Sequence, residues 1–220
     1  VEIGDLVYDG FLRENDVSTI DFNDPNLKEY FTKAICLVDY WFNYFKNNDV
    51  NALIQSHNVY LLGIPGRVAC SLNIDVYNAS CFEVYYLTKS KPYKFNYFEE
   101  YPKLFKKFPK KIRKKGILAA KKYLTNRLTG KGDLLYSKSR KFNVNPFKKA
   151  ENNSFNFLKK PKILIAAHDF TDAPHVHRKM LFTDFHEWME YLGNLSKKTE
   201  KYEWLIKLHP SEFKNNEEKI

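Results

Sequence analysis

Three predicted strands of this 220-residue chain end in a histidine. The histidines are His57, His168 and His209, and the apolar runs before them lie at 51–56, 162–167 and 202–208. In an open parallel sheet, ligands bind outside the carboxyl ends of the strands. Imidazole can donate a hydrogen bond to a phosphate oxygen, and it can take a proton near neutral pH. The pattern therefore predicts acid–base chemistry or an anionic ligand at these strand ends.

Lys207 adds a positive charge beside the third of these strand ends. Lys207 and His209 are two residues apart on an extended segment, so their side chains project to the same side. Pro210 holds the residue before it extended, which fixes the direction of His209. An ammonium group beside an imidazole suits a diphosphate. The alternative is that Lys207 extends into solvent and His209 merely ends the strand.

Two residues are candidate general bases. His57 can take a proton from an attacking hydroxyl because the pKa of a histidine lies near neutrality. Asp172, in the polar loop after the second of these strands, is the rival base or a residue that binds the acceptor. Each has a plainer interpretation, since a loop histidine can bond to neighbouring backbone and an aspartate before Ala173 and Pro174 can form a turn.

A polar cluster occurs early in the chain, at Asp5, Tyr8, Asp9 and Arg13. A guanidinium at Arg13 can bind a sugar acid or a phosphate. The alternative is a surface ion pair among Asp5, Asp9 and Arg13.

Hydrophobic periodicity predicts an α/β fold with two units. The predicted elements are a long helix from Pro25 to 47–48, strands at 51–56, 74–77 and 82–87, a helix from Pro65, helices between 102 and 128, a strand at 162–167, a helix with capping-box residues Asp184 and Glu187, and a strand at 202–208. Strands that alternate with helices are typical of parallel sheets. We predict a first domain at 1–129 that includes a basic helical segment at 101–128, a linker at 130–160, and a second domain from 161 to 220.

The net charge of +10 is concentrated in one segment. Residues 101–122 hold ten basic residues and no acid: Lys103, Lys106, Lys107, Lys110, Lys111, Arg113, Lys114, Lys115, Lys121 and Lys122. Apolar residues are interleaved with them, which suits a helix lying on an anionic membrane surface. The plain alternative is a solvated helical face. No signature of an RNA- or DNA-binding module accompanies the charge, so we predict no nucleic-acid partner.

Four segments resemble capsule and surface-polysaccharide glycosyltransferases of the GT-B type. They are IGDLVYDGFLR at 3–13, LIQSHNVYLLGIPGRVACSLNIDVY at 53–77, ILIAAHDFTDAPHVHRKMLFTDFHEWMEYL at 163–192 and YEWLIKLHPSE at 202–212. The His-Pro dipeptide at a strand end is similar to that of Kdo transferases, polysialyltransferases and polyol-phosphate transferases. The resemblance implies two Rossmann-like halves, the second truncated here, and a CMP- or UDP-linked sugar as substrate, with no further cofactor and no metal.

The resemblance also implies roles for particular residues. It places Lys207, His209, Pro210 and His168 at the donor and Arg13, Asp9 and His175 at the glycan or lipid-linked acceptor, and it implies a cytoplasmic enzyme peripheral to the inner face of the plasma membrane. Three alternatives stay open. They are a CDP-polyol phosphotransferase of the teichoic-acid type, a non-catalytic module that binds membrane or nucleic acid, and a metal hydrolase built on the histidines around the His175-Val176-His177 stretch.

Overall fold

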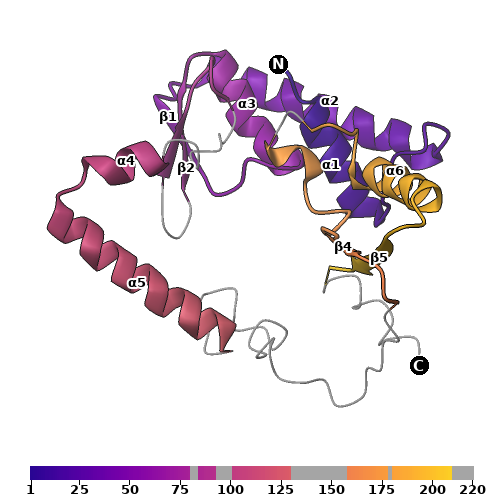
Figure 1. The fold of residues 1–220 in the computed structure, drawn as a ribbon. Coiled ribbons are helices and arrows are strands. Elements are labelled where there is room, and N and C mark those ends of the chain that lie inside the picture. The colour runs from indigo at the N-terminus through magenta and orange to yellow at the C-terminus, as the bar shows by residue number, and fades with distance from the viewer. Residues whose placement is uncertain (80–83, 93–100, 130–157, 178–179, 210–220) are drawn as a thin grey trace. The chain divides into compact units, whose positions relative to one another are not determined.

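The computed structural model describes residues 1–79, 84–92, 101–129, 158–177 and 180–209 (Figure 1). The described chain is mixed α/β, with one three-stranded and one two-stranded sheet, which confirms the predicted α/β class. It forms two compact units. The first combines Val1–Phe95 with Lys160–Asn215, and the second holds the helices of the basic segment. The predicted linker falls almost wholly outside the described residues, so the predicted domain limits stay a prediction.

Two helices open the first unit. Helix α1 (Gly4–Asn15) begins without a side-chain cap, whereas helix α2 (Pro25–Asn47) begins as predicted, with Asp24 accepting a hydrogen bond from the Asn26 backbone N–H at 2.8 Å. Gly10 lets the helices approach closely, because a Cβ there would lie 2.2 Å from the Tyr30 hydroxyl. The apolar stripe predicted for α2 is wider than the face it buries, since several of its aromatic and aliphatic side chains are exposed.

The first sheet has the order β1-β2-β3 and consists of β1 (Ala52–Gln55), β2 (Asp75–Ala79) and β3 (Val84–Leu87). Strands β1 and β2 are parallel, and the 3-10 turn η1 (Leu61–Gly63) and helix α3 (Ile64–Ser71) connect them. Strand β3 runs antiparallel to β2. The expectation of a purely parallel sheet is therefore wrong here, because the chain between β2 and β3 is too short for a crossover.

The core of this part lies between α1, α3 and the sheet. Its fully buried apolar side chains are Phe11, Leu12, Ile64, Val68, Val76 and Leu87. The side chain of Arg67 is buried beside them. Arg67 on α3 binds the Asp5 carboxylate on α1 through both of its terminal nitrogens, at 2.6 and 3.3 Å, and also donates to the Glu2 carbonyl at 3.0 Å. This fork fixes α1 against α3.

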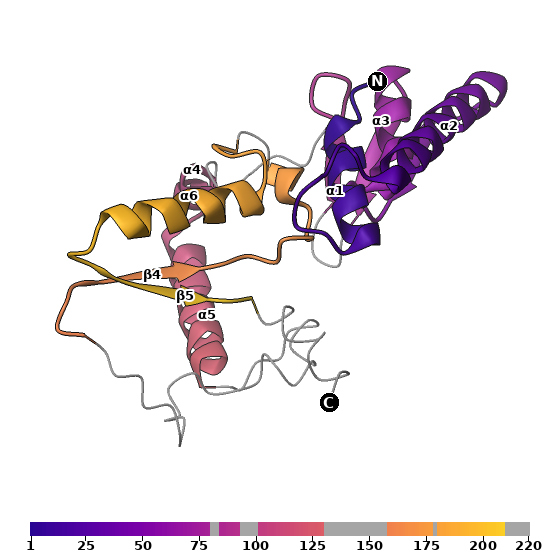
Figure 2. The ribbon, with the colours of Figure 1, turned by 90° about the vertical axis from the view of Figure 1, so that its right-hand side faces the viewer.

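The remaining elements of the first unit form a βαβ crossover. Strands β4 (Lys162–Ala166) and β5 (Glu203–Lys207) pair in parallel, and the turn η5 (Pro174–His177) and helix α6 (Phe185–Lys198) lie between them in sequence. Helix α6 runs beside the two strands in both views (Figure 2). Its N-cap is Asp184, which accepts from the Glu187 N–H at 2.8 Å, as the capping-box spacing predicts.

The second unit is described through helices α4 (Tyr101–Lys107) and α5 (Lys110–Leu128), which confirm the helices predicted for the basic segment. Most of their side chains are exposed. Across the described ranges of both units, no helix combines the length and the apolar character needed to cross a bilayer.

Candidate functional site

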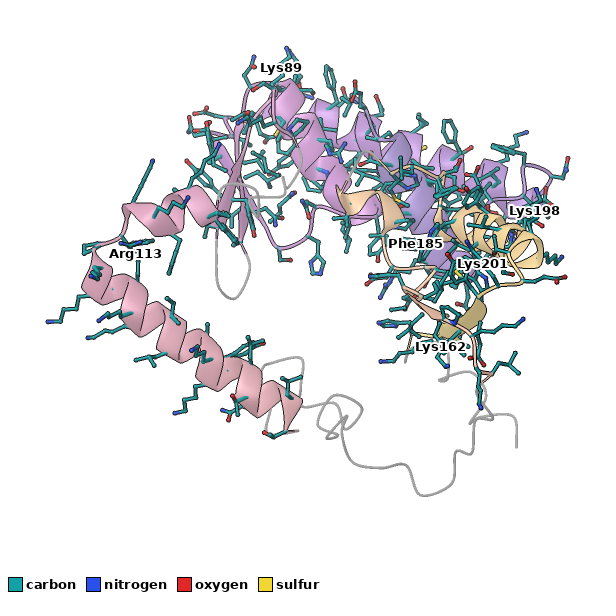
Figure 3. All side chains as sticks on the ribbon, in the orientation of Figure 1. Lys89, Arg113, Lys162, Phe185, Lys198 and Lys201 are labelled. Atoms are coloured by element: carbon teal, nitrogen blue, oxygen red, sulfur yellow. The ribbon has the colours of Figure 1, made fainter. Side chains whose placement is uncertain are left out.

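The carboxyl ends of β4 and β5 bring His168 and His209 together. Ala166 pairs with Lys207 at the ends of the strands, and each histidine lies two residues beyond that pair. The two histidine rings stack with centroids 5.6 Å apart and planes 21° apart. The ring of Phe185 lies 4.9 Å from that of His168. Phe185 is the first residue of α6 and is labelled in Figure 3. Nδ1 of His168 lies 3.0 Å from the Asp169 carbonyl oxygen, so Nδ1 carries the proton and Nε2 is the acceptor of the neutral ring.

Lys207 is the last residue of β5, two residues before His209, and it is exposed. Three of the four residues predicted to bind the donor therefore lie at one sheet edge. The fourth, Pro210, lies outside the described residues.

Asp172 lies in a second polar group, four residues beyond His168 in the chain. Its Oδ1 accepts a hydrogen bond from the Tyr60 hydroxyl at 2.9 Å. The same oxygen forms an ion pair with Nη1 of Arg13 at 3.5 Å. Arg13 also donates to the Tyr60 hydroxyl at 3.0 Å, with its guanidinium 5.0 Å from the ring centroid. Burial, and then the hydrogen bond to Asp172, raise the pKa of Tyr60, so the phenol stays a donor at physiological pH. Both Arg13 and Asp172 are 54% exposed, which leaves the carboxylate open to solvent.

Two residues of this group have unusual backbone conformations. Tyr60 has φ 54° with ψ −165°, and Ala173, which follows Asp172, has φ 44°. Residues other than glycine rarely adopt positive φ, and such strain costs about 1–3 kcal/mol per residue. Strained residues of this kind concentrate at functional sites, where the surrounding structure holds them in place. Their position on both sides of the Tyr60–Asp172 hydrogen bond marks this group as the part of the surface to test for function.

Asp9 and His175 form a third, more deeply placed pair. The His175 ring Nδ1 lies 2.5 Å from Asp9 Oδ1, and the His175 backbone N–H donates to Asp9 Oδ2 at 3.1 Å. The Asp9 side chain is 4% exposed and that of His175 is 25% exposed. The hydrogen bond to Asp9 raises the pKa of His175, against the opposing effect of burial, and the Thr183 carbonyl adds to the rise. Both carboxylate oxygens of Asp9 already bind His175 and are buried, which does not favour the predicted role of Asp9 in acceptor binding. We infer that Asp9 positions His175.

Tyr8 ties the same region to the start of α6. Its hydroxyl donates to Asp184 Oδ2 at 2.6 Å, and its ring meets His175 edge-on at 4.9 Å. Burial, and then the hydrogen bond to Asp184, raise the pKa of Tyr8 to about 12. Two neighbouring residues of α1 therefore contact the segment after β4: Tyr8 binds Asp184, and Asp9 binds His175.

The Asp9–His175 pair predicts a pH-dependent stability. Because the pKa of His175 is raised above 6.5 in the folded state, the stabilisation is complete below that pH and is lost as the pH rises through the folded-state value. We expect the free energy of unfolding, measured with urea at a series of pH values, to fall across this window. In His175→Gln the fall should be smaller. Equal slopes for the two proteins would contradict the assignment.

His57 lies apart from these groups. It is exposed, and its Nδ1 lies 2.8 Å from the Ser56 hydroxyl. Within the described part of the chain, no hydrogen bond or ion pair joins it to Asp172 or His175. The loop after β1 reaches Asp172 through Tyr60 instead, so the role of His57 as a base stays a prediction.

A metal centre has no support from the described side chains, among which no three His, Cys, Asp or Glu residues gather closely enough to hold an ion. The side chain of His177, part of the sequence stretch considered for zinc, lies outside that description.

Three contributors to the site were not predicted as such: Tyr60, the contact of Tyr8 with Asp184, and Arg67 as the partner of Asp5. Each joins positions that are more than 60 residues apart, or in the case of Tyr60 more than 40 residues from both of its partners. Contacts between such distant positions leave no local pattern in the sequence from which they could be predicted. No protein-family model, curated protein or solved structure matches this chain, so its function is inferred from the residues themselves.

Proposed function

We propose that the chain is part of a glycosyltransferase of GT-B type that moves a sugar from a nucleotide-sugar donor to a surface or capsule polysaccharide. The observation that carries this proposal is the stacked His168–His209 pair at the carboxyl ends of two parallel strands. The solvent-accessible carboxylate of Asp172 lies four residues after His168 in the chain. The proposal also rests on the resemblance of the same segments to capsule-polysaccharide enzymes.

The phosphate of the donor is the group that the strand ends suit. The imidazole of His209 can donate a hydrogen bond to a phosphate oxygen, His168 can do so through Nε2 when its ring is protonated, and Lys207 supplies a positive charge. As the bond between the anomeric carbon and the phosphate oxygen breaks, negative charge grows on the departing nucleotide. Donors fixed at that position stabilise the transition state more than the ground state.

Asp172 is the group that we assign to the acceptor. Its carboxylate takes the proton of the attacking hydroxyl as the acceptor oxygen forms its bond to the anomeric carbon. Tyr60 and Arg13 both bind Oδ1, and among the described residues no donor contacts Oδ2, which is left for the acceptor. Arg13 is also exposed enough to reach an acidic sugar.

A donor panel tests the reaction class. The full chain is mixed with UDP-, CMP- and GDP-linked sugars and with CDP-glycerol, and binding is followed by thermal shift while products on an oligosaccharide acceptor are identified by mass. A product heavier by one sugar supports the proposal. A product heavier by a polyol phosphate would replace it with the phosphotransferase alternative, and stabilisation by none of the donors would contradict both.

Replacing His209 by Ala is expected to weaken donor binding and transfer by about tenfold to 150-fold, because a hydrogen bond to a charged group is worth about 1.5–3 kcal/mol. His186→Ala is the matched control, since His186 contacts Ser18 and Glu190 on the surface instead of the strand ends. The measurements are donor affinity by calorimetry and initial rates. Equal losses in the two variants, or none in His209→Ala, would count against the donor edge.

A further inference from the structure

Helix α5 carries its lysines on one side. With about 100° of rotation per residue, its six lysines fall within an arc of about 140°. They are Lys110, Lys111, Lys114, Lys115, Lys121 and Lys122, and all six are exposed. No acidic residue interrupts 101–129, so nothing on α5 itself or on α4 neutralises this face.

The opposite side of α5 carries exposed apolar residues interspersed with Arg113 and, by its position in the helix, Arg127, while Leu118 lies among the lysines. Ile112, Ile117, Tyr123 and Leu124 lie there, with between 41 and 56% of each residue open to solvent. Gly116 lies within the same arc, and a Cβ at that position would come 3.8 Å from the Phe105 ring of α4. Phe105 and Leu104 are themselves 40 and 43% exposed. The two helices thus present exposed apolar side chains that the described residues of this unit do not cover.

We propose that α5, with α4, is a membrane-binding element that lies in the plane of an anionic lipid surface. Exposed lysines combined with exposed apolar side chains suit the boundary between headgroups and acyl chains. A second copy of the helix is a poor occupant of the side opposite the lysines, because Arg113 lies on that side and pairing would bring like charges together. A nucleic acid would satisfy the lysines but would leave Ile117, Tyr123 and Leu124 in water.

Vesicle sedimentation of the full chain tests this proposal. We expect binding to vesicles of phosphatidylglycerol mixed with phosphatidylcholine, little binding to phosphatidylcholine alone, and weaker binding as salt is added. Each lysine near an anionic surface contributes about fivefold to binding. Changing Lys110, Lys111, Lys114 and Lys115 to Gln should therefore weaken binding by roughly a hundredfold or more, whereas Arg at the same four positions should preserve it.

A second variant separates a membrane from any other polyanion. Ile117→Ser together with Leu124→Ser keeps every charge, and on a membrane it should lose binding too, with helicity followed by circular dichroism. The proposal is overturned if the Gln variant binds as the wild type does, or if neutral and anionic vesicles bind alike. It is also overturned if the Ser variant keeps its affinity while duplex DNA displaces the vesicles, which would identify a nucleic-acid surface.

Discussion

Replacing Asp172 by Asn is expected to lower kcat for sugar transfer by about 10²–10⁴-fold, the usual contribution of a general base. Asparagine keeps the shape of the side chain and can still accept from Tyr60, but it cannot take the acceptor proton. The free energy of unfolding should change by less than about 1 kcal/mol, because the ion pair with Arg13 is exposed and such pairs contribute little. Initial rates at saturating donor and acceptor, with urea unfolding of the same protein, measure both effects.

His57 provides the competing outcome. If His57→Gln lost activity while Asp172→Asn kept it, the base would be His57 and the Asp172 group would have another role. Tyr60→Phe distinguishes a positioning role from a chemical one. It removes the donor to Asp172 Oδ1, so a positioning role predicts a lowered kcat that is still well above that of Asp172→Asn. A kcat in Tyr60→Phe as low as that of Asp172→Asn would instead assign Tyr60 to the chemistry.

Elements whose signals are local could be predicted from the sequence. Asp24 and Pro25 fix the start of α2, and the capping-box pair Asp184 and Glu187 fixes the start of α6. The apolar runs before His168 and His209 predict β4 and β5, and the crossover between them implies parallel pairing. The meeting of the two histidines therefore follows from strand-end reasoning, although their exact ring stacking does not.

Helix α1 could not be predicted in the same way. It has no capping side chain at Ile3, it contains two glycines, and its buried face includes the charged residue Asp9. These features weaken the apolar periodicity on which helix prediction rests. The structure also does not form the surface ion pair that was the alternative for Asp5, Asp9 and Arg13. Each of the three binds a group on a distant segment instead, and only the folded chain shows which.

Replacing Asp9 by Ala is expected to lower the free energy of unfolding by about 3 kcal/mol, near the loss found when one partner of a buried ion pair is removed. The change leaves His175 with an unpaired Nδ1 and an unpaired backbone N–H, both part-buried between α1 and the loop after β4. We expect the difference in the free energy of unfolding between the wild type and Asp9→Ala, measured with urea, to be largest below pH 6.5. The stabilisation by protonated His175 is complete there.

Asp172→Ala is the matched control for this loss, since it removes an aspartate that is also hydrogen-bonded but is 54% exposed rather than 4%. Burial decides the ranking: the stability of the fold should depend on Asp9 and hardly on Asp172, while transfer should depend directly on Asp172. A residual rate in Asp9→Ala that scales with its folded fraction would support a positioning role for Asp9. If Asp9→Ala stayed fully folded yet lost all transfer, Asp9 would be part of the reacting site, and Asp172 would have to be reconsidered as the base.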